Sequence, residues 1–125
     1  MAVLTEKDIT SQFVGKTVSF ENLTKYTYRN GTCNDPAVYI AYSCHFLYNR
    51  ELQELFGVTD KLKEQWERRG IDFNVCIHTI GDKIIYCGID KYREDDGARP
   101  SCRDLKCTQQ ELRIALRILT YATSA

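Results

Sequence analysis

Residues 71–89, IDFNVCIHTIGDKIIYCGI, decide the fold. Two runs rich in β-branched and aromatic residues flank Gly81-Asp82 in this stretch, and both runs have the composition typical of strands. Glycine at the first position of a two-residue loop is what a type II′ turn requires. We therefore predict a β-hairpin with strands over 71–80 and 83–89.

The predicted turn also sets a register for the hairpin. With Gly81-Asp82 as the whole loop, Cys76 faces Cys87, and His78 lies on the same side of the sheet as Cys76 because side chains alternate with a period of two. Cys76, His78 and Cys87 are zinc-ligand types, and they form an alternative metal site that would need a fourth ligand from a later cysteine. Free cysteine is among the most buried residue types, so we favour packed free thiols and expect no metal and no other cofactor.

Other elements are predicted on both sides of the hairpin. Residues 37–49, AVYIAYSCHFLYN, follow Asp35-Pro36, a capping side chain with proline at the first helical position. Because this run is apolar on nearly every face, it predicts a buried central helix. The β-branched and aromatic density of residues 17–29 predicts a further strand region.

Thr108 and Glu111 have the spacing of a capping box, which predicts the start of a C-terminal amphipathic helix. Together these elements predict an α+β fold, with a small antiparallel sheet packed against the central helix and the C-terminal helix. The length of 125 residues is typical of one domain, so we predict a single domain over residues 1–125.

The C-terminal helix is apolar over more of its circumference than one core-facing side needs. The excess predicts a homo-oligomer, with a dimer as the commonest symmetric form. The interface residues predicted on this helix are Ile114, Ile118 and Tyr121.

Composition and charge exclude some classes of protein. The chain has 17 Lys and Arg and 17 Asp and Glu, so no net field draws the whole surface to nucleic acid or anionic lipid. The start of the chain turns polar after four residues, which argues against a signal peptide, and no apolar run is long enough to span a bilayer. We expect a cytoplasmic protein without a membrane partner, whose six cysteines are not paired in disulfides.

Cys33 is the candidate nucleophile. It lies in GTCNDP, residues 31–36, before the predicted central helix, whose dipole would lower the pKa of its thiol, and His78 could act as its base. The order of cysteine on a helix and histidine on a strand resembles that of transglutaminases, arylamine acetyltransferases and papain-like enzymes, which implies Asp90 as the third residue. The predicted register places Asp90 about 16 Å along the strand from His78, so we do not favour catalysis.

Two groups of residues are candidates for ligand binding. Residues 25–29, KYTYR, interleave bases with aromatic residues, as platforms for single-stranded nucleic acid do. Arginines in the mixed-charge stretch after the hairpin could bind an anion. The predicted binding residues are Tyr26, Tyr28, Arg29, Arg93, Arg99 and Arg103.

From these features we predict a small intracellular binding or regulatory protein that acts without catalysis, as an inhibitor or by sequestering a ligand. The partner would be a protein or a small polar ligand, and the size of the chain also fits a phage or viral accessory protein. One alternative is a cysteine-dependent hydrolase or acyltransferase that uses Cys33 and His78. Another is nucleotide or nucleic-acid binding through Tyr26, Tyr28 and the nearby Arg and Lys.

Overall fold

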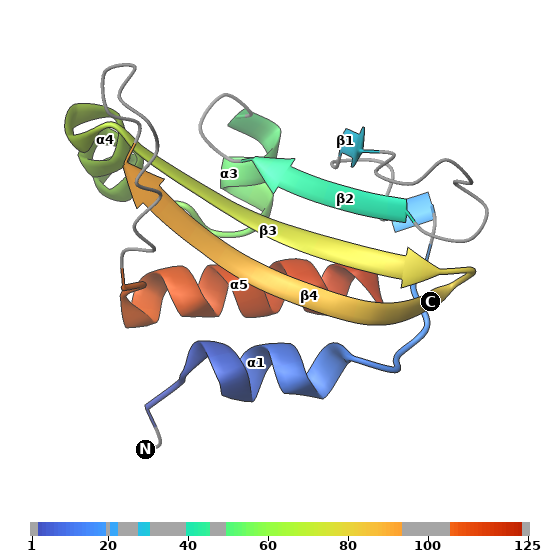
Figure 1. Cartoon of the computed structure of the whole chain (residues 1–125). Coiled ribbons are helices and arrows are strands. Elements are labelled where there is room, and N and C mark those ends of the chain that lie inside the picture. The colour runs from blue at the N-terminus through green and yellow to red at the C-terminus, as the bar shows by residue number, and fades with distance from the viewer. Residues whose placement is uncertain are drawn as a thin grey trace.

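The computed structural model describes residues 3–19, 21–22, 28–30, 40–45, 50–93 and 106–123. Within these ranges the strands form a four-stranded antiparallel sheet in the order β1-β2-β3-β4 (Figure 1). The strands are β1 (Tyr28–Asn30), β2 (Ile40–His45), β3 (Ile71–Ile80) and β4 (Lys83–Arg93). The helices are α1 (Glu6–Phe13), α3 (Arg50–Leu55), α4 (Asp60–Arg69) and α5 (Gln109–Ala122).

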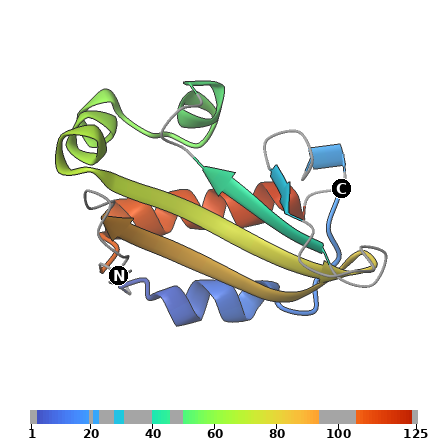
Figure 2. The same ribbon diagram turned by 45° about the horizontal axis from the view of Figure 1, so that its top comes forward.

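The core lies between the sheet and its helices. Both α1 and α5 run beside β3 and β4 on one side of the sheet, whereas α3 and α4 connect β2 to β3 (Figures 1 and 2). Trp66 of α4 stacks on Phe73 of β3 at a ring-centroid distance of 5.2 Å, which joins α4 to this core. The α+β class predicted from the sequence is therefore confirmed. Within the described residues, no helix is long and apolar enough to cross a membrane.

The predicted hairpin and its turn are confirmed. Ile80 pairs with Lys83, so Gly81 and Asp82 form the whole loop, and Gly81 has a φ of +60°. A positive φ at the first loop residue is the reason why glycine is needed there.

The register predicted for the hairpin is wrong beyond its first two pairs. Thr79 pairs with Ile84, but His78 pairs with Tyr86, so Ile85 is an extra residue in a β-bulge. As a result Cys76 faces Gly88, and Cys87 faces Ile77 instead of Cys76.

The bulge has a packing reason. Ile84, Cys87 and Ile89 are all buried in the core, although strict alternation from Ile84 would direct Tyr86 and Gly88 to the helices instead. One extra residue restores the apolar side chains to the core face. Tyr86 is left 49% exposed on the other face, which we call the outer face.

The buried central helix predicted over 37–49 is also wrong, because residues 40–45 form β2. This strand pairs with β1 on one side and β3 on the other, so it is an interior strand of the sheet. An apolar run suits an interior strand as well as a buried helix, and periodicity alone does not separate them. Of the wider predicted strand region over 17–29, the described residues show a bridge between Thr17 and Lys83 and β1 at its end, whereas residues 20 and 23–27 lie outside the described residues.

The predicted C-terminal helix is confirmed as α5, with the Thr108–Glu111 capping box at its start. Its two apolar sides both lie inside the fold. Ile114 and Ile118 are 2% and 3% exposed, so these two predicted interface residues are wrong, and Tyr121 is half-buried. The apolar excess that suggested a homo-oligomer is thus accounted for within one chain.

Candidate functional site

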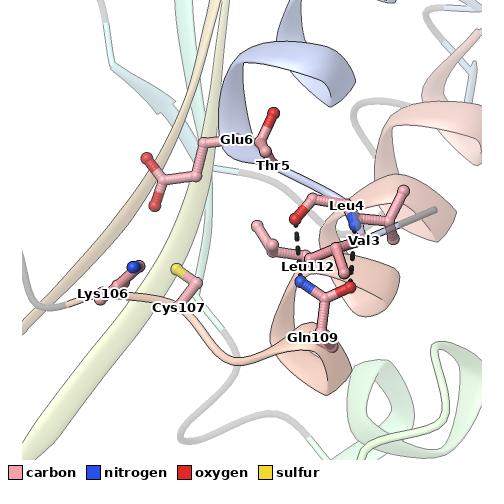
Figure 3. A pocket seen from close by; sticks show the side chains of 8 residues that line it. All are labelled: Val3, Leu4, Thr5, Glu6, Lys106, Cys107, Gln109 and Leu112. Atoms are coloured by element: carbon pink, nitrogen blue, oxygen red, sulfur yellow. Dashed lines mark hydrogen bonds between the residues drawn. The ribbon is translucent and has the colours of Figure 1, made fainter.

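A hollow of about 460 Å³ lies where α1 and α5 begin, and we call it the α1–α5 hollow. Its volume is in the range of about 300–1,000 Å³ that small-molecule sites occupy. The residues that line it are Val3, Leu4, Thr5, Glu6, Lys106, Cys107, Gln109 and Leu112 (Figure 3).

The α1 side of the hollow is fixed by a helix cap. Thr5 is the N-cap, and its side chain accepts a hydrogen bond from the Asp8 amide at 3.1 Å. This cap makes Glu6 the first residue of α1, where a carboxylate is favoured by the helix dipole.

The α5 side is fixed by the capping box and by Gln109. The side-chain amide of Gln109 accepts a hydrogen bond from Leu4 N at 2.9 Å and donates one to Leu4 O at 2.8 Å (Figure 3). These two bonds resemble one rung of a β-ladder, and they hold the extended segment before α1 against the first turn of α5.

A buried ion pair supports this part of the hollow. The Lys91 ammonium lies 2.8 Å from the Glu111 carboxylate, and the two side chains are 7% and 1% exposed. Lys91 also donates to the backbone oxygen of Lys106 at 3.3 Å, and Trp66 donates to the other carboxylate oxygen of Glu111 at 2.7 Å. The ion pair therefore ties the segment before α5 to β4 and α4.

The hydrogen bonds decide the charge state of Glu111. Burial alone would raise the pKa of this carboxyl, but the bonds from Lys91, the Thr108 amide and Trp66 outweigh burial and lower it. Both carboxylate oxygens accept hydrogen bonds from these partners, so the role of Glu111 is structural.

The charged residues of the hollow are exposed at its rim. Figure 3 shows Glu6, Lys106 and Cys107 at one side of the hollow, and Leu4, Gln109 and Leu112 at the other. Burial, together with the influence of the Glu6 carboxylate, raises the pKa of the Cys107 thiol to about 12. The thiol is therefore protonated near neutral pH and is not an activated nucleophile.

Cys76 and Cys87 are equally unsuited to nucleophilic attack. Burial raises the pKa of Cys76 to about 11, with the Asp90 charge as the second cause, and burial alone raises that of Cys87 to about 11. Cys87 donates a hydrogen bond to the Thr10 carbonyl of α1 at 3.3 Å. Cys76 and Cys87 are free cysteines, as predicted, but they do not face each other.

His78 lies on the outer face, beside Tyr86 at a ring-centroid distance of 4.9 Å. Burial lowers its pKa, and the Asp90 charge opposes this to a smaller extent. Asp90 pairs with Asn74, four β3 residues away from His78, which corresponds to about 13 Å along the strand.

The alternative zinc site is wrong. Cys76 and His78 share the outer face, but Cys87 pairs with Ile77 and is buried in the core on the opposite face. Among the residues that the structure describes, no group of three or more His, Cys, Asp or Glu could hold a metal ion.

Of the predicted binding residues, the structure describes Tyr28, Arg29 and Arg93, and it does not bring Arg93 together with the other two. Arg29 lies in a cross-strand row with Tyr42 and Ile77, whereas Arg93 pairs with Ile71, about 20 Å away along β3. Tyr28 pairs with Ser43, which pairs with Cys76. Tyr26, Cys33, Arg99 and Arg103 lie outside the described residues.

Sequence reasoning missed the hollow, although the signals of both helix starts were present. Thr5 and Thr108 are recognisable caps, and each is preceded by an apolar residue, Leu4 or Cys107. The two helix starts lie close together only because of the tertiary fold. The spacing of residues in the sequence does not predict this proximity.

Comparison of the chain with models of protein families, with curated proteins and with solved structures found no match.

Proposed function

We propose that this is a small binding protein that acts without catalysis and holds a small molecule in the α1–α5 hollow. The observation that carries the proposal is the division of the hollow into a charged side and a side with Leu4 and Leu112. Ligand sites typically combine an apolar lining with a few convergent polar groups that orient the ligand. Sequestration of a ligand, and regulation through it, is the role that this arrangement favours.

The chemistry of the thiols supports a binding role over an enzymatic one. A cysteine nucleophile needs a lowered pKa, and at Cys76, Cys87 and Cys107 burial raises the pKa instead. The enzyme alternative through Cys33 is separable by experiment. Iodoacetamide at pH 6 would label Cys33 selectively if its thiol were acidified, and we expect no such selectivity.

Ligand screening with two matched variants tests the proposal. Val3 is 71% exposed and lines the hollow, whereas Val14 is 51% exposed and follows the other end of α1. Val3→Trp should obstruct the hollow, and Val14→Trp adds the same bulk elsewhere. We expect a metabolite library to contain compounds that raise the melting temperature of the wild type and of Val14→Trp more than that of Val3→Trp.

Amide chemical shifts give a second measurement on the same compounds. Ligands in the hollow should shift the amide signals of Leu4, Glu6 and Gln109 first. The proposal is overturned if no compound binds, or if the compounds that bind shift signals away from the hollow and are indifferent to Val3→Trp.

A further inference from the structure

We infer that the ligand of the α1–α5 hollow is a small zwitterion with apolar side chains, of about the size of a dipeptide. The inference rests on the proposed function and names the class of ligand. It follows from three properties of the lining: two charges of opposite sign, an apolar side, and the volume.

The two charges belong to Glu6 and Lys106. Glu6 is the first residue of α1 and lines the same side of the hollow as Cys107. Lys106 comes directly before that cysteine, and its backbone oxygen accepts a hydrogen bond from Lys91. A ligand with one charge would be attracted by one of these residues and repelled by the other. A ligand with an ammonium and a carboxylate group can satisfy both.

The apolar side and the volume define the rest of the ligand. Leu4 and Leu112 supply aliphatic surface, and the Gln109 amide, bonded to Leu4, fixes their spacing. The hollow of about 460 Å³ has more room than a single amino acid fills. An aliphatic dipeptide with free ends combines the two charges with two apolar side chains.

Calorimetric titration with the dipeptide Leu-Leu and three relatives tests this class. N-acetyl-Leu-Leu lacks the ammonium group, Leu-Leu amide lacks the carboxylate, and Gly-Gly lacks the apolar side chains. We expect Leu-Leu to bind best. Because the charges are at an exposed rim, loss of either ligand charge should weaken binding by roughly fivefold.

Two variants of the protein assign each ligand charge to its partner. Glu6→Gln should remove the difference in affinity between Leu-Leu and N-acetyl-Leu-Leu. It should keep the difference in affinity between Leu-Leu and Leu-Leu amide. Lys106→Gln should remove the difference in affinity between Leu-Leu and Leu-Leu amide and keep the difference between Leu-Leu and N-acetyl-Leu-Leu. The matched controls are Glu64→Gln and Lys61→Gln, two exposed charges on α4, which should leave both differences unchanged.

The outcomes separate this inference from the proposed function. If Leu-Leu fails to bind while another library compound maps to the hollow, the zwitterion is wrong and the binding function stands. If Leu-Leu binds but Glu6→Gln and Lys106→Gln do not change the affinity differences between Leu-Leu and its two modified forms as stated, the assignment of the ligand charges to Glu6 and Lys106 is overturned. If nothing binds in the hollow, both are overturned.

Discussion

Two pairs of lysine and glutamate lie next to each other at the start of α5, and they differ in burial. Lys91 and Glu111 are 7% and 1% exposed and are bonded to one another at 2.8 Å. Glu6 and Lys106 are exposed, and they belong to the rim of the α1–α5 hollow. The residue types are the same, so the difference in role comes from their surroundings.

The buried pair has further support, because Trp66 and the Thr108 amide also donate hydrogen bonds to the Glu111 carboxylate. An ion pair that is removed from water stabilises a fold only when such extra hydrogen bonds are present. The rim charges keep their hydration, so they contribute little to stability and are available to a ligand.

The largest effect is expected for Glu111→Gln. The substitution keeps the shape of the side chain but leaves the Lys91 charge buried without its counter-ion. Breaking a buried pair in this way costs about 3–5 kcal/mol of unfolding free energy. Urea denaturation measures it, with Glu64→Gln on the exposed side of α4 as the control.

A cost of less than about 1 kcal/mol for Glu111→Gln would be the value expected of an exposed pair. It would mean that water reaches Lys91, and that the Lys91–Glu111 pair does not differ in burial from the Glu6 and Lys106 charges.

Acid should weaken the buried pair specifically. The folded state lowers the pKa of Glu111 from 4.5, so its stabilisation is complete above that value and is lost as the pH falls through the folded pKa. Trp66, the only tryptophan, donates to this carboxylate, so its fluorescence can follow unfolding in urea between pH 7 and 3.

The variant Glu111→Gln provides the control for acid unfolding. Its unfolding free energy should fall less steeply below pH 5 than that of the wild type. Parallel pH dependences of the two proteins would show that other carboxyls cause the acid sensitivity.

How much of this was predictable from the sequence depends on whether the signal is local. The turn at Gly81-Asp82 and the cap at Thr108 involve neighbouring residues only, and both were predicted correctly. The bulge at Ile85 depends on which side of β4 meets the helices, so pairing by turn length alone gave the wrong partner for Cys76.

The apolar run 37–49 shows the same limit. Its composition indicated burial but did not distinguish a helix from β2, which is decided by hydrogen bonds to β1 and β3. The α1–α5 hollow required still more, because Leu4 and Gln109 are 105 residues apart in the chain. Ile118 was misassigned for a related reason, since an apolar helix face is equally suited to a core and to an interface.

An intermediate effect is expected for Gln109→Ala, which removes both hydrogen bonds to the Leu4 backbone. The loss should cost about 1–2 kcal/mol, because typical net values are near 1 kcal/mol for each bond. It should also speed hydrogen exchange of the Leu4 amide. Gln110→Ala is the matched control, and equal exchange rates in the two variants would show that Gln109 does not hold this segment.

The smallest effect on stability is expected for Glu6→Gln, which should instead change the pKa of the Cys107 thiol. Its carboxylate favours the first turn of α1, so the substitution should cost no more than about 1 kcal/mol. Because the Glu6 carboxylate adds to the effect of burial in raising the pKa of Cys107 to about 12, its removal should lower that pKa, while burial keeps it above 9.0. Iodoacetamide labelling of Cys107 as a function of pH, read by peptide mass mapping, would then show a midpoint at lower pH than in the wild type. Asp8→Asn removes another acidic side chain from the same first turn and should leave the midpoint unchanged. If both variants shift it equally, the rim carboxylate acts through the helix as a whole, and Glu6 has no specific contact with the thiol.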